Sequence, residues 1–321
     1  MGWPITLYYL QGRTLSIEEV FQAMIIAGEG WEELVAVLSR ADTRERIYVI
    51  GSTNSGKATL CRYLTDALPH RARAYVDCDT GQSTIGPPAT EGMIFYPASP
   101  ELPGRPLLRF VGSTSPGGHF LQTLTGARRL VEKAVELGAG ATVIDSPGII
   151  SGGAGIEFQI QMIDLLRPTR IAALQRGREL EPLLANFARN PVITIHRLPV
   201  SPAAVVRNAT GRRRYREERF AAYFTDARPR EVSLRGIGFQ GHVPDLRDPR
   251  GAERRLVSLN DHDNFSLALG VAGEIETRRR RLTIVAPPFD PAAVASIRFG
   301  SLNLDLDAEP GSMESHIRKR M

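Results

Sequence analysis

One glycine-rich segment of the chain has the residue types and the spacing of a phosphate-binding site. It reads G-S-T-N-S-G-K-A-T and directly follows the apolar run I-Y-V-I. Glycines let the backbone curl so that successive N–H groups point at phosphate oxygens, and Lys57 adds a point charge. An amphipathic segment comes next, so the order strand, phosphate loop, helix is predicted. The residues predicted to contact a nucleotide are Gly51, Ser52, Thr53, Asn54, Ser55, Gly56, Lys57, Ala58 and Thr59.

Two residues of this loop carry further information. Lys57 is one of only three lysines, whereas the other 37 basic residues of the chain are arginines, so a compact ammonium group is indicated here. The next residue is Ala58, where such loops have Ser or Thr to bind Mg²⁺. Metal binding therefore either rests on Asp79, water and the nucleotide, or is weak. Thr59 could instead contact the α-phosphate.

A pair of carboxylates ends the next apolar run, in Y-V-D-C-D-T-G-Q. Side chains alternate along a strand, so Asp77 and Asp79 point to one side, near the phosphate loop. One could accept a proton from an attacking hydroxyl group and the other could hold the water shell of a metal ion. We therefore predict Asp79 and Asp77 as metal-associated residues. The alternative is that one of them, above all Asp77, only caps the following turn.

These motifs need a scaffold, and from residue 46 to about 199 apolar β-rich runs alternate with helical patterns. Such alternation predicts an α/β fold, with a mostly parallel sheet flanked by helices. Ligands of these folds bind at the carboxyl ends of the strands, where the polar motifs fall. The expected strands are 47–50, 74–78, 107–111, 141–144, 171–174 and 192–195, and the expected helices are 56–68, 120–137, 157–166 and 180–188.

The flanking regions have different patterns. The first 45 residues predict a strand at 5–10 and helices at 16–26 and 31–38, packed on the next domain. A basic helical segment at 207–224 precedes short alternating strands at 232–239, 255–259, 265–275, 281–285 and 297–306. We therefore predict a P-loop NTPase with a small C-terminal β domain. The predicted divisions are 1–45, 46–228 with the basic helix, 229–310, and a loose basic tail at 311–321.

Composition narrows the class of protein further. The net charge is +5 with a pI near 9.5, and arginines cluster at 207–219, 278–281 and 318–320, which suits a polyanionic partner or a solvated surface. No apolar run approaches the roughly 18 residues of a membrane span, and no signal peptide is evident, so a cytoplasmic protein without a membrane partner is expected. Cys61 and Cys78 lie in predicted core elements, which indicates reduced buried thiols and no structural metal.

Five segments, in their order, resemble the polynucleotide 5′-hydroxyl kinase family. This family includes the eukaryotic pre-mRNA cleavage-factor kinase and the nucleolar pre-ribosomal-RNA processing kinase. The resemblance covers about residues 46 to 300 and lies in G-S-T-N-S-G-K-A-T-L-C-R, D-C-D-T-G-Q, F-V-G-S-T-S-P, R-N-A-T-G-R-R-R-Y-R-E-E-R-F and L-V-S-L-N-D-H-D-N-F-S-L-A-L-G-V. The fourth segment is similar to the arginine-bearing lid of that family.

The resemblance implies transfer of the γ-phosphate of ATP, or another NTP, to the 5′-OH of RNA or DNA. Lys57 would contact the β- and γ-phosphates, and Asp79 would be the general base. Arg207 and Arg212, five residues apart in the lid, would reach over the transferring phosphoryl group. Gln82, Thr114 and Ser115 would line the acceptor side, and Arg213, Arg214 and Arg216 would contact the phosphate backbone of the strand.

One segment departs from the family pattern. D-S-P-G-I stands where the family has Thr-x-Gly-Trp, and Ile149 cannot stack on a base as an indole would. Asp145 could be a second carboxylate near a metal or a turn residue. A second hypothesis is therefore a catalytically silent ATP-binding scaffold of an RNA-processing assembly, with Ala58 as its sign. A GTPase is disfavoured because the chain has no N-K-x-D guanine reader, and no oligomeric state is predicted.

Overall fold

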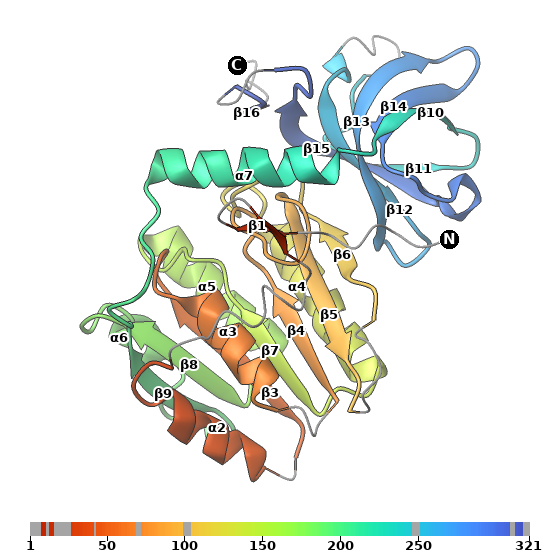
Figure 1. Ribbon diagram of the computed structural model, residues 1–321. Coiled ribbons are helices and arrows are strands. Elements are labelled where there is room, and N and C mark those ends of the chain that lie inside the picture. Colours follow the sequence, from red (N-terminus) through yellow and green to blue (C-terminus); the bar gives the residue numbers. More distant parts are fainter. Residues whose placement is uncertain are drawn as a thin grey trace.

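A seven-stranded sheet forms the centre of the larger part of the molecule (Figure 1). The computed structural model describes residues 8–10, 13–15, 27–41, 43–68, 72–98, 104–245, 251–308 and 312–316. The strand order is β6-β5-β4-β7-β3-β8-β9, and β4, β7, β3, β8 and β9 are parallel. The strands are β3 Glu45–Gly51, β4 Arg73–Asp77, β5 Thr90–Tyr96, β6 Leu107–Phe110, β7 Ala141–Asp145, β8 Arg170–Gln175 and β9 Thr194–Pro199. The predicted mostly parallel α/β sheet is confirmed.

Helices cover both faces of this sheet, which explains its long apolar runs. One face packs on α2 (Trp31–Ser39) and α3 (Lys57–Asp66), which supply the buried Trp31 and Leu64. The other face packs on α4 (Phe120–Glu136), α5 (Gly153–Leu166) and the short α6 (Glu181–Leu184). Cys61 belongs to the first core and Cys78 to the second, and both are buried free thiols, as predicted.

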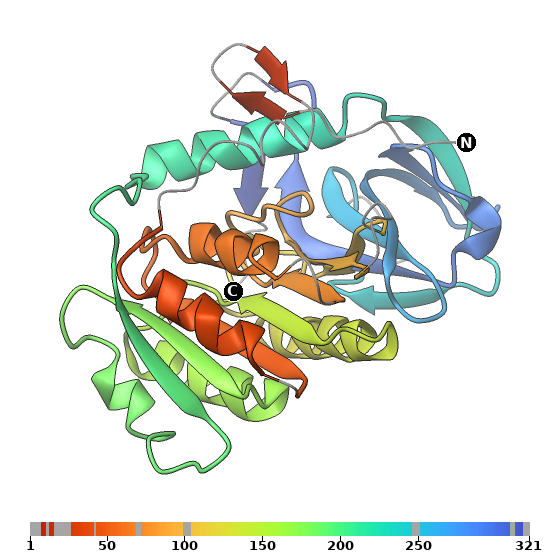
Figure 2. The same ribbon diagram turned by 60° about the horizontal axis from the view of Figure 1, so that its bottom comes forward.

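The C-terminal part is a second sheet, and a long helix connects it to the first (Figures 1 and 2). The helix α7 (Ala209–Tyr223) lies above the first sheet and ends at the second, and Phe220 and the C-cap residue Phe224 are buried in a cluster with residues of both. The second sheet has the order β10-β14-β13-β12-β15-β11, and β16 pairs with β15. Its strands are β10 Arg228–Ser233, β11 Gly238–Gly241, β12 Arg255–Asn260, β13 Ser266–Glu276, β14 Arg281–Ala286, β15 Ser296–Leu304 and β16 Glu314–His316, with a 3₁₀ turn, η2, at Pro291–Ala293.

Several sequence-based element predictions were wrong or incomplete. The expected strand 232–239 is instead two strands, β10 and β11, because Gly236 turns the chain at φ 71°. Strand β5 was not predicted, the predicted strand 192–195 begins two residues before β9 and ends before it does, and the tail contains β16. At the N-terminus β1 (Tyr8–Leu10) pairs with β2 (Arg13–Leu15), whereas the helix predicted at 16–26 lies outside the described residues. The domain boundaries stay a prediction.

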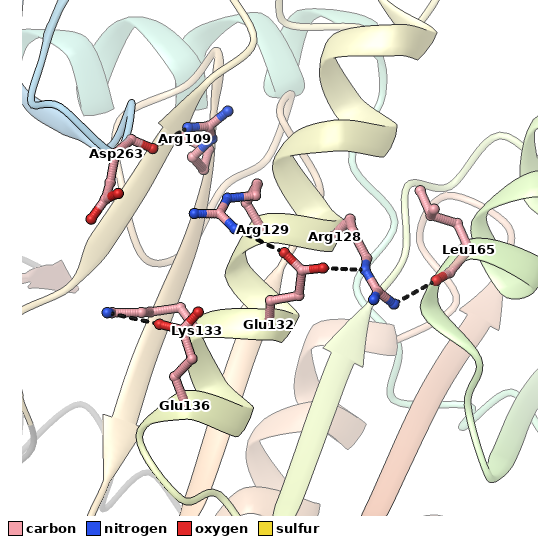
Figure 3. A network of polar contacts seen from close by, with 8 residues as sticks. All are labelled: Arg109, Arg128, Arg129, Glu132, Lys133, Glu136, Leu165 and Asp263. Atoms are coloured by element: carbon pink, nitrogen blue, oxygen red, sulfur yellow. Dashed lines mark hydrogen bonds and ion pairs between the residues drawn. The ribbon is translucent and has the colours of Figure 1, made fainter.

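A polar network joins the two sheets (Figure 3). Arg109 of β6 donates from Nη1 to the carbonyl oxygen of Asp263 at 3.1 Å and to that of Asn264, in the turn between β12 and β13. Beside it on α4, Glu132 pairs with Arg128 at 2.8 Å and with Arg129 at 3.0 Å. The turn that Arg109 holds is part of the segment L-N-D-H-D-N-F recognised in the sequence, so this motif has a structural role at the interface.

One buried carboxyl group has little to stabilise its charge. Glu91 of β5 is fully buried, and neither of its carboxyl oxygens has a side-chain hydrogen-bond partner in the described chain. It lies against α4 so closely that a Cβ on Gly126 would approach Oε2 to 2.0 Å. Burial raises the pKa of Glu91 well above its usual range, although Arg109 on the neighbouring strand opposes the shift.

Replacing Glu91 with glutamine is expected to change how stability depends on pH. The folded pKa lies above that of the unfolded chain, so the folded state binds more protons and stability falls as pH rises above about 4.3. Glu91→Gln removes this dependence and should therefore stabilise the protein most at pH 8. Denaturant midpoints between pH 5 and 8 measure the effect, with the exposed Glu136→Gln as control. Parallel pH profiles for wild type and Glu91→Gln would contradict it.

Within the described part of the chain, no helix combines the length and the apolar character needed to cross a membrane.

Candidate active site

The phosphate loop has hydrogen-bonding groups that are available to a polyphosphate. It runs from the end of β3 to the first turn of α3, where Gly56 at φ 86° is the N-cap and supplies no side-chain hydrogen bond. The first N–H groups of a helix have no acceptor within the helix, so these point to the space above the loop. Ser55 Oγ is buried and has no hydrogen-bond partner among the described residues. The loop therefore fits the phosphates of a nucleotide.

Lys57 is held along the loop and is almost fully buried. Its Nζ donates to the carbonyl oxygen of Ser52 at 3.2 Å, and the residue is 6% exposed. Asn54 takes the left-handed backbone conformation at φ 63°, which lets the loop curl before the helix. This geometry presents the ammonium group to the same space as the helix N-terminus.

The three carboxylates at the strand ends have different environments. Asp77 accepts from the N–H of Asp79 at 2.9 Å, and from the N–H and hydroxyl of Thr84 at 2.6 and 2.9 Å. Both of its oxygens thus hold the loop that follows β4, which favours the turn-capping alternative. Asp79 is partly exposed, and its Oδ1 accepts the N–H groups of Gly81 and Gln82 at 3.0 Å each. The other oxygen of Asp79 is left for a ligand.

Asp145, whose role the sequence left open, lies directly beside Asp77 at the end of β7. It is 3% exposed, and its Oδ1 has no hydrogen-bond partner in the described chain. Burial raises its pKa well above the usual range; Lys57 opposes the shift, and Asp77 and Asp79 add to it. A cation arriving at this end of the sheet would therefore be stabilised by Asp145.

Magnesium fits these residues when the nucleotide supplies most of the ligands. The described residues contain no group of three acidic, histidine or cysteine side chains that could hold a metal by themselves. The unpartnered oxygen of Asp145, with Asp79, could complete the shell of an ion held by phosphates and water. This arrangement suits Mg²⁺, which keeps several waters.

A half-open cleft of about 210 Å³ lies next to the phosphate loop. It is bordered by Thr53 of that loop, by the segments that follow β4, β6 and β7, and by two arginines of α7. Figure 1 shows that α7 lies above this sheet. Gly81 makes the close approach of two walls possible, because a Cβ there would lie 2.7 Å from the carbonyl oxygen of Thr114. The lining residues are Thr53, Asp79, Gly81, Gln82, Thr114, Ser115, Pro116, Pro147, Gly148, Ile149, Arg212 and Arg216.

The wall formed by residues 147–149 is held from behind by a buried glutamine. Gln159 of α5 donates from Nε2 to the carbonyl oxygens of Pro147 at 2.7 Å and Ile149 at 3.1 Å. Its own Oε1 accepts from the hydroxyl of Tyr48 at 2.6 Å. The segment that departs from the family pattern is therefore rigidly supported and places Ile149 in the cleft.

The basic helix α7 begins over the phosphate loop. The carbonyl oxygen of Arg207 accepts from Asn54 Nδ2 at 3.1 Å, and the Nη1 of Arg207 donates to Gln82 Oε1 at 3.3 Å. Further along, Tyr215 donates its hydroxyl to the carbonyl oxygen of Ser83 at 2.9 Å, and Arg219 donates to that of Gly86 at 2.9 Å. The helix is therefore docked on the loop that carries Asp79.

The arginines of α7 divide into two groups. Arg212 and Arg216 line the cleft, whereas Arg213 pairs with Glu217 at 3.2 Å and lies outside the cleft lining. The structure thus brings Asp79, Gln82, Thr114, Ser115, Arg212 and Arg216 together, with Arg207 at the rim, and does not bring Arg213 to them.

Arg176, which directly follows β8, is a residue of the site that was not predicted from the sequence. Its Nη1 donates to Ser52 Oγ at 3.2 Å and its Nη2 donates to the carbonyl oxygen of Asn54 at 3.0 Å. Its position after a parallel strand, at the same edge as every other motif, was the available signal. Tyr215 and Arg219 were also missed as contacts that dock the helix.

A parallel sheet whose glycine-rich loop passes into a helix with a buried lysine defines a P-loop nucleotide-binding protein. Residues 51–226, more than half of the chain, match the family described as "mRNA cleavage and polyadenylation factor CLP1 P-loop". The chain belongs to the CLP1 P-loop family.

Individual relatives agree with this assignment. Proteins named polyribonucleotide 5′-hydroxyl-kinase from Pyrococcus abyssi and Pyrococcus furiosus are 26% and 28% identical to it, over 82% of this chain and 89% of each relative. Human polyribonucleotide 5′-hydroxyl-kinase Clp1 is 28% identical over 56% of this chain and 45% of its own length. The solved structure of wild-type Clp1p in complex with Pcf11p has the same fold, with a TM-score of 0.64 at 13% identity, over 85% of this chain and 78% of that one.

The contact between Gly148 and the phosphate loop gives a test of the site. A Cβ at Gly148 would lie 3.0 Å from the backbone nitrogen and 3.1 Å from the Cα of Thr53, and backbone cannot swing aside as a side chain can. Gly148→Ala should therefore displace the loop and weaken ATP binding at least about tenfold, which is roughly 1.4 kcal/mol. Gly153→Ala is the matched control, because nothing lies within 4 Å of its added Cβ. Equal ATP affinities in titration calorimetry would show that the contact is unimportant.

Proposed function

We propose that this protein is an ATP-dependent polynucleotide 5′-hydroxyl kinase, which transfers the γ-phosphate of ATP or another NTP to the 5′-OH of RNA or DNA. The observation that carries the proposal is the cleft beside the phosphate loop, where a carboxylate, hydroxyl groups and two arginines meet. The names of the archaeal relatives, which are similar along most of the chain, support the same activity.

In the proposed reaction the 5′ hydroxyl oxygen attacks the γ-phosphorus while its proton passes to Asp79. Asp79 Oδ1 is held by two N–H groups, so Oδ2 is the proton acceptor. The bond from the γ-phosphorus to the bridging oxygen breaks, and the nucleoside diphosphate leaves with Lys57 beside its β-phosphate. Bound Mg²⁺ would neutralise part of the phosphate charge.

Arg212 and Arg216 stabilise the charge on the equatorial oxygens, and Arg207 does so from the rim of the cleft. Gln82, Thr114 and Ser115 contact the acceptor end of the strand. We assign no substrate contact to Arg213, because its guanidinium pairs with Glu217.

The second hypothesis, an ATP-binding scaffold, rests on Ala58. The described carboxylate and arginines of the cleft favour the kinase, because holding ATP alone gives no physical reason to gather them next to an open acceptor site.

A transfer assay with labelled ATP, Mg²⁺ and 5′-OH oligonucleotides of RNA and DNA tests the proposal. Asp79→Asn keeps an oxygen for the two N–H groups but removes the base, so the rate should fall about 10² to 10⁴-fold with ATP affinity unchanged. Arg212→Ala should also lower the rate. Arg214→Ala is the matched control, because this arginine is 81% exposed and pairs with Glu218.

Two results would count against this reading. Binding of ATP without transfer to any strand would favour the scaffold. Full activity of Asp79→Asn would show that another group accepts the proton.

Restoring the missing hydroxyl at Ala58 tests the metal site. Ala58→Ser places an oxygen on the first turn of α3, so half-maximal activity should be reached at a Mg²⁺ concentration lower by about threefold to tenfold. A Mg²⁺ titration of activity makes the comparison, with Ala58→Val as a control that adds bulk without a hydroxyl group. An unchanged titration would mean that Thr59 or a carboxylate already provides this ligand.

A further inference from the structure

Arg176 makes an outward contact to the phosphate loop that the proposed chemistry does not use. It is exposed, yet its guanidinium donates to two groups of the loop, Ser52 Oγ and the carbonyl oxygen of Asn54, at 3.2 and 3.0 Å. The planar guanidinium therefore lies across the outside of the loop that holds the phosphates. Holding an exposed arginine side chain in one place costs conformational entropy, so the immobilisation of Arg176 calls for an explanation.

The backbone that carries Arg176 is also held firmly. Glu179 accepts the N–H of Arg176 through Oε1 at 2.8 Å and the N–H of Gly177 through Oε2 at 2.9 Å. Behind it, Gln175 donates to Glu181 at 2.9 Å, and Glu181 pairs with Arg197 at 2.8 Å. The loop after β8 is thus a fixed support that directs Arg176 towards Ser52 and Asn54.

The geometry of phosphoryl transfer separates the two ends of the donor. The attacking and leaving oxygens lie roughly in line across the γ-phosphorus. The acceptor arrives from the cleft over β4 and β7, so the rest of the donor must extend from the loop away from that cleft. β8 lies on the opposite side of β3 from β7, and Arg176 follows β8. The nucleoside is therefore expected on the side of Arg176.

A second feature on this side is apolar. The segment before α7 passes close to the loop. The Cβ of Ala204 lies 3.9 Å from the position that a Cβ on Gly56 would occupy, and the carbonyl oxygen of Arg207 accepts a hydrogen bond from Asn54. Between these two contacts, Val205 and Val206 are 73% and 72% exposed. Two adjacent, strongly exposed valines beside a phosphate loop suit a ligand with an apolar face.

We propose that Arg176, with Val205 and Val206, forms the subsite for the nucleoside of the donor NTP, where the guanidinium lies against the base or ribose. This rests on the proposed function only for the direction in which the donor lies. The planar guanidinium stacks on aromatic rings as well as donating hydrogen bonds, whereas a lysine there would offer charge alone. Arg176 is thus a specificity-determining residue that distinguishes a nucleotide from a bare polyphosphate.

The test compares the binding of ATP with that of inorganic tripolyphosphate, measured by calorimetry with Mg²⁺ and without any acceptor strand. Arg176→Ala and Arg176→Lys should each weaken ATP binding about fivefold or more and leave tripolyphosphate binding within about twofold. Val205→Asn/Val206→Asn should have the same pattern. Arg189→Ala changes another exposed arginine in the connection between β8 and β9 and should alter neither.

The outcomes separate this subsite from a loop brace and from the kinase proposal. Equal weakening of both ligands by Arg176→Ala would show that the arginine only braces the phosphate loop, which overturns the subsite. So would unchanged binding of both. The binding measurement contains no acceptor strand and is therefore independent of the transfer assay. A protein that binds ATP more tightly than tripolyphosphate but transfers no phosphate in the transfer assay would overturn the kinase proposal and leave the subsite standing.

Discussion

Parallel pairing of β3 with β7 and β8 is the interaction on which the site depends. The register places Val49 opposite Asp145 and Gly51 opposite Leu174. The phosphate loop therefore emerges between the carboxylate that ends β7 and the arginine that follows β8. Since β3 is buried on both faces, a slip of one residue would exchange its two apolar faces and move every one of these groups. The hydrophobic core thus fixes the site to within a residue.

Polar groups at the carboxyl edge of the first sheet are better satisfied with a ligand bound than in the protein alone. Asp145 and Ser55 each have a buried oxygen without a partner in the described chain, and the first turn of α3 has no side-chain cap. Each unfilled group costs stability, and such costs persist where the surrounding structure enforces them. Here the enforcement comes from two packed helical layers. The same groups cost nothing once phosphates and their counter-ions fill the site.

Much of this could be predicted from the sequence, for reasons that are local. The phosphate loop, the alternation of strands and helices and the buried cysteines follow from spacing and composition, and the cleft gathers residues of motifs that end strands, such as Asp79 and Thr114. What could not be distinguished in the sequence depends on tertiary contact. Asp77 and Asp79 look alike in the sequence, but Thr84 donates hydrogen bonds to Asp77. Arg213 and Arg216 differ only in the side of α7 on which they lie. Strand β5 was missed because Glu91, which is buried, and Gly92 lie near its start, and both residue types are depleted in strands.

The two ends of α7 are fixed very differently. At its C-terminal end Phe220 and Phe224 are buried, and Tyr223 accepts the N–H of Leu269 at 2.8 Å. At the other end the contacts of Arg207 are exposed hydrogen bonds. The apolar packing at the C-terminal end of α7 is thus a pivot about which the helix would tilt, and the charged residues lie at its N-terminal tip. Its 15 residues span roughly 22 Å, so a tilt of about 10° would move the tip by about 4 Å, more than the length of a hydrogen bond. The C-terminal sheet, which holds the pivot, therefore sets the distance between the N-terminal end of α7 and the phosphate loop.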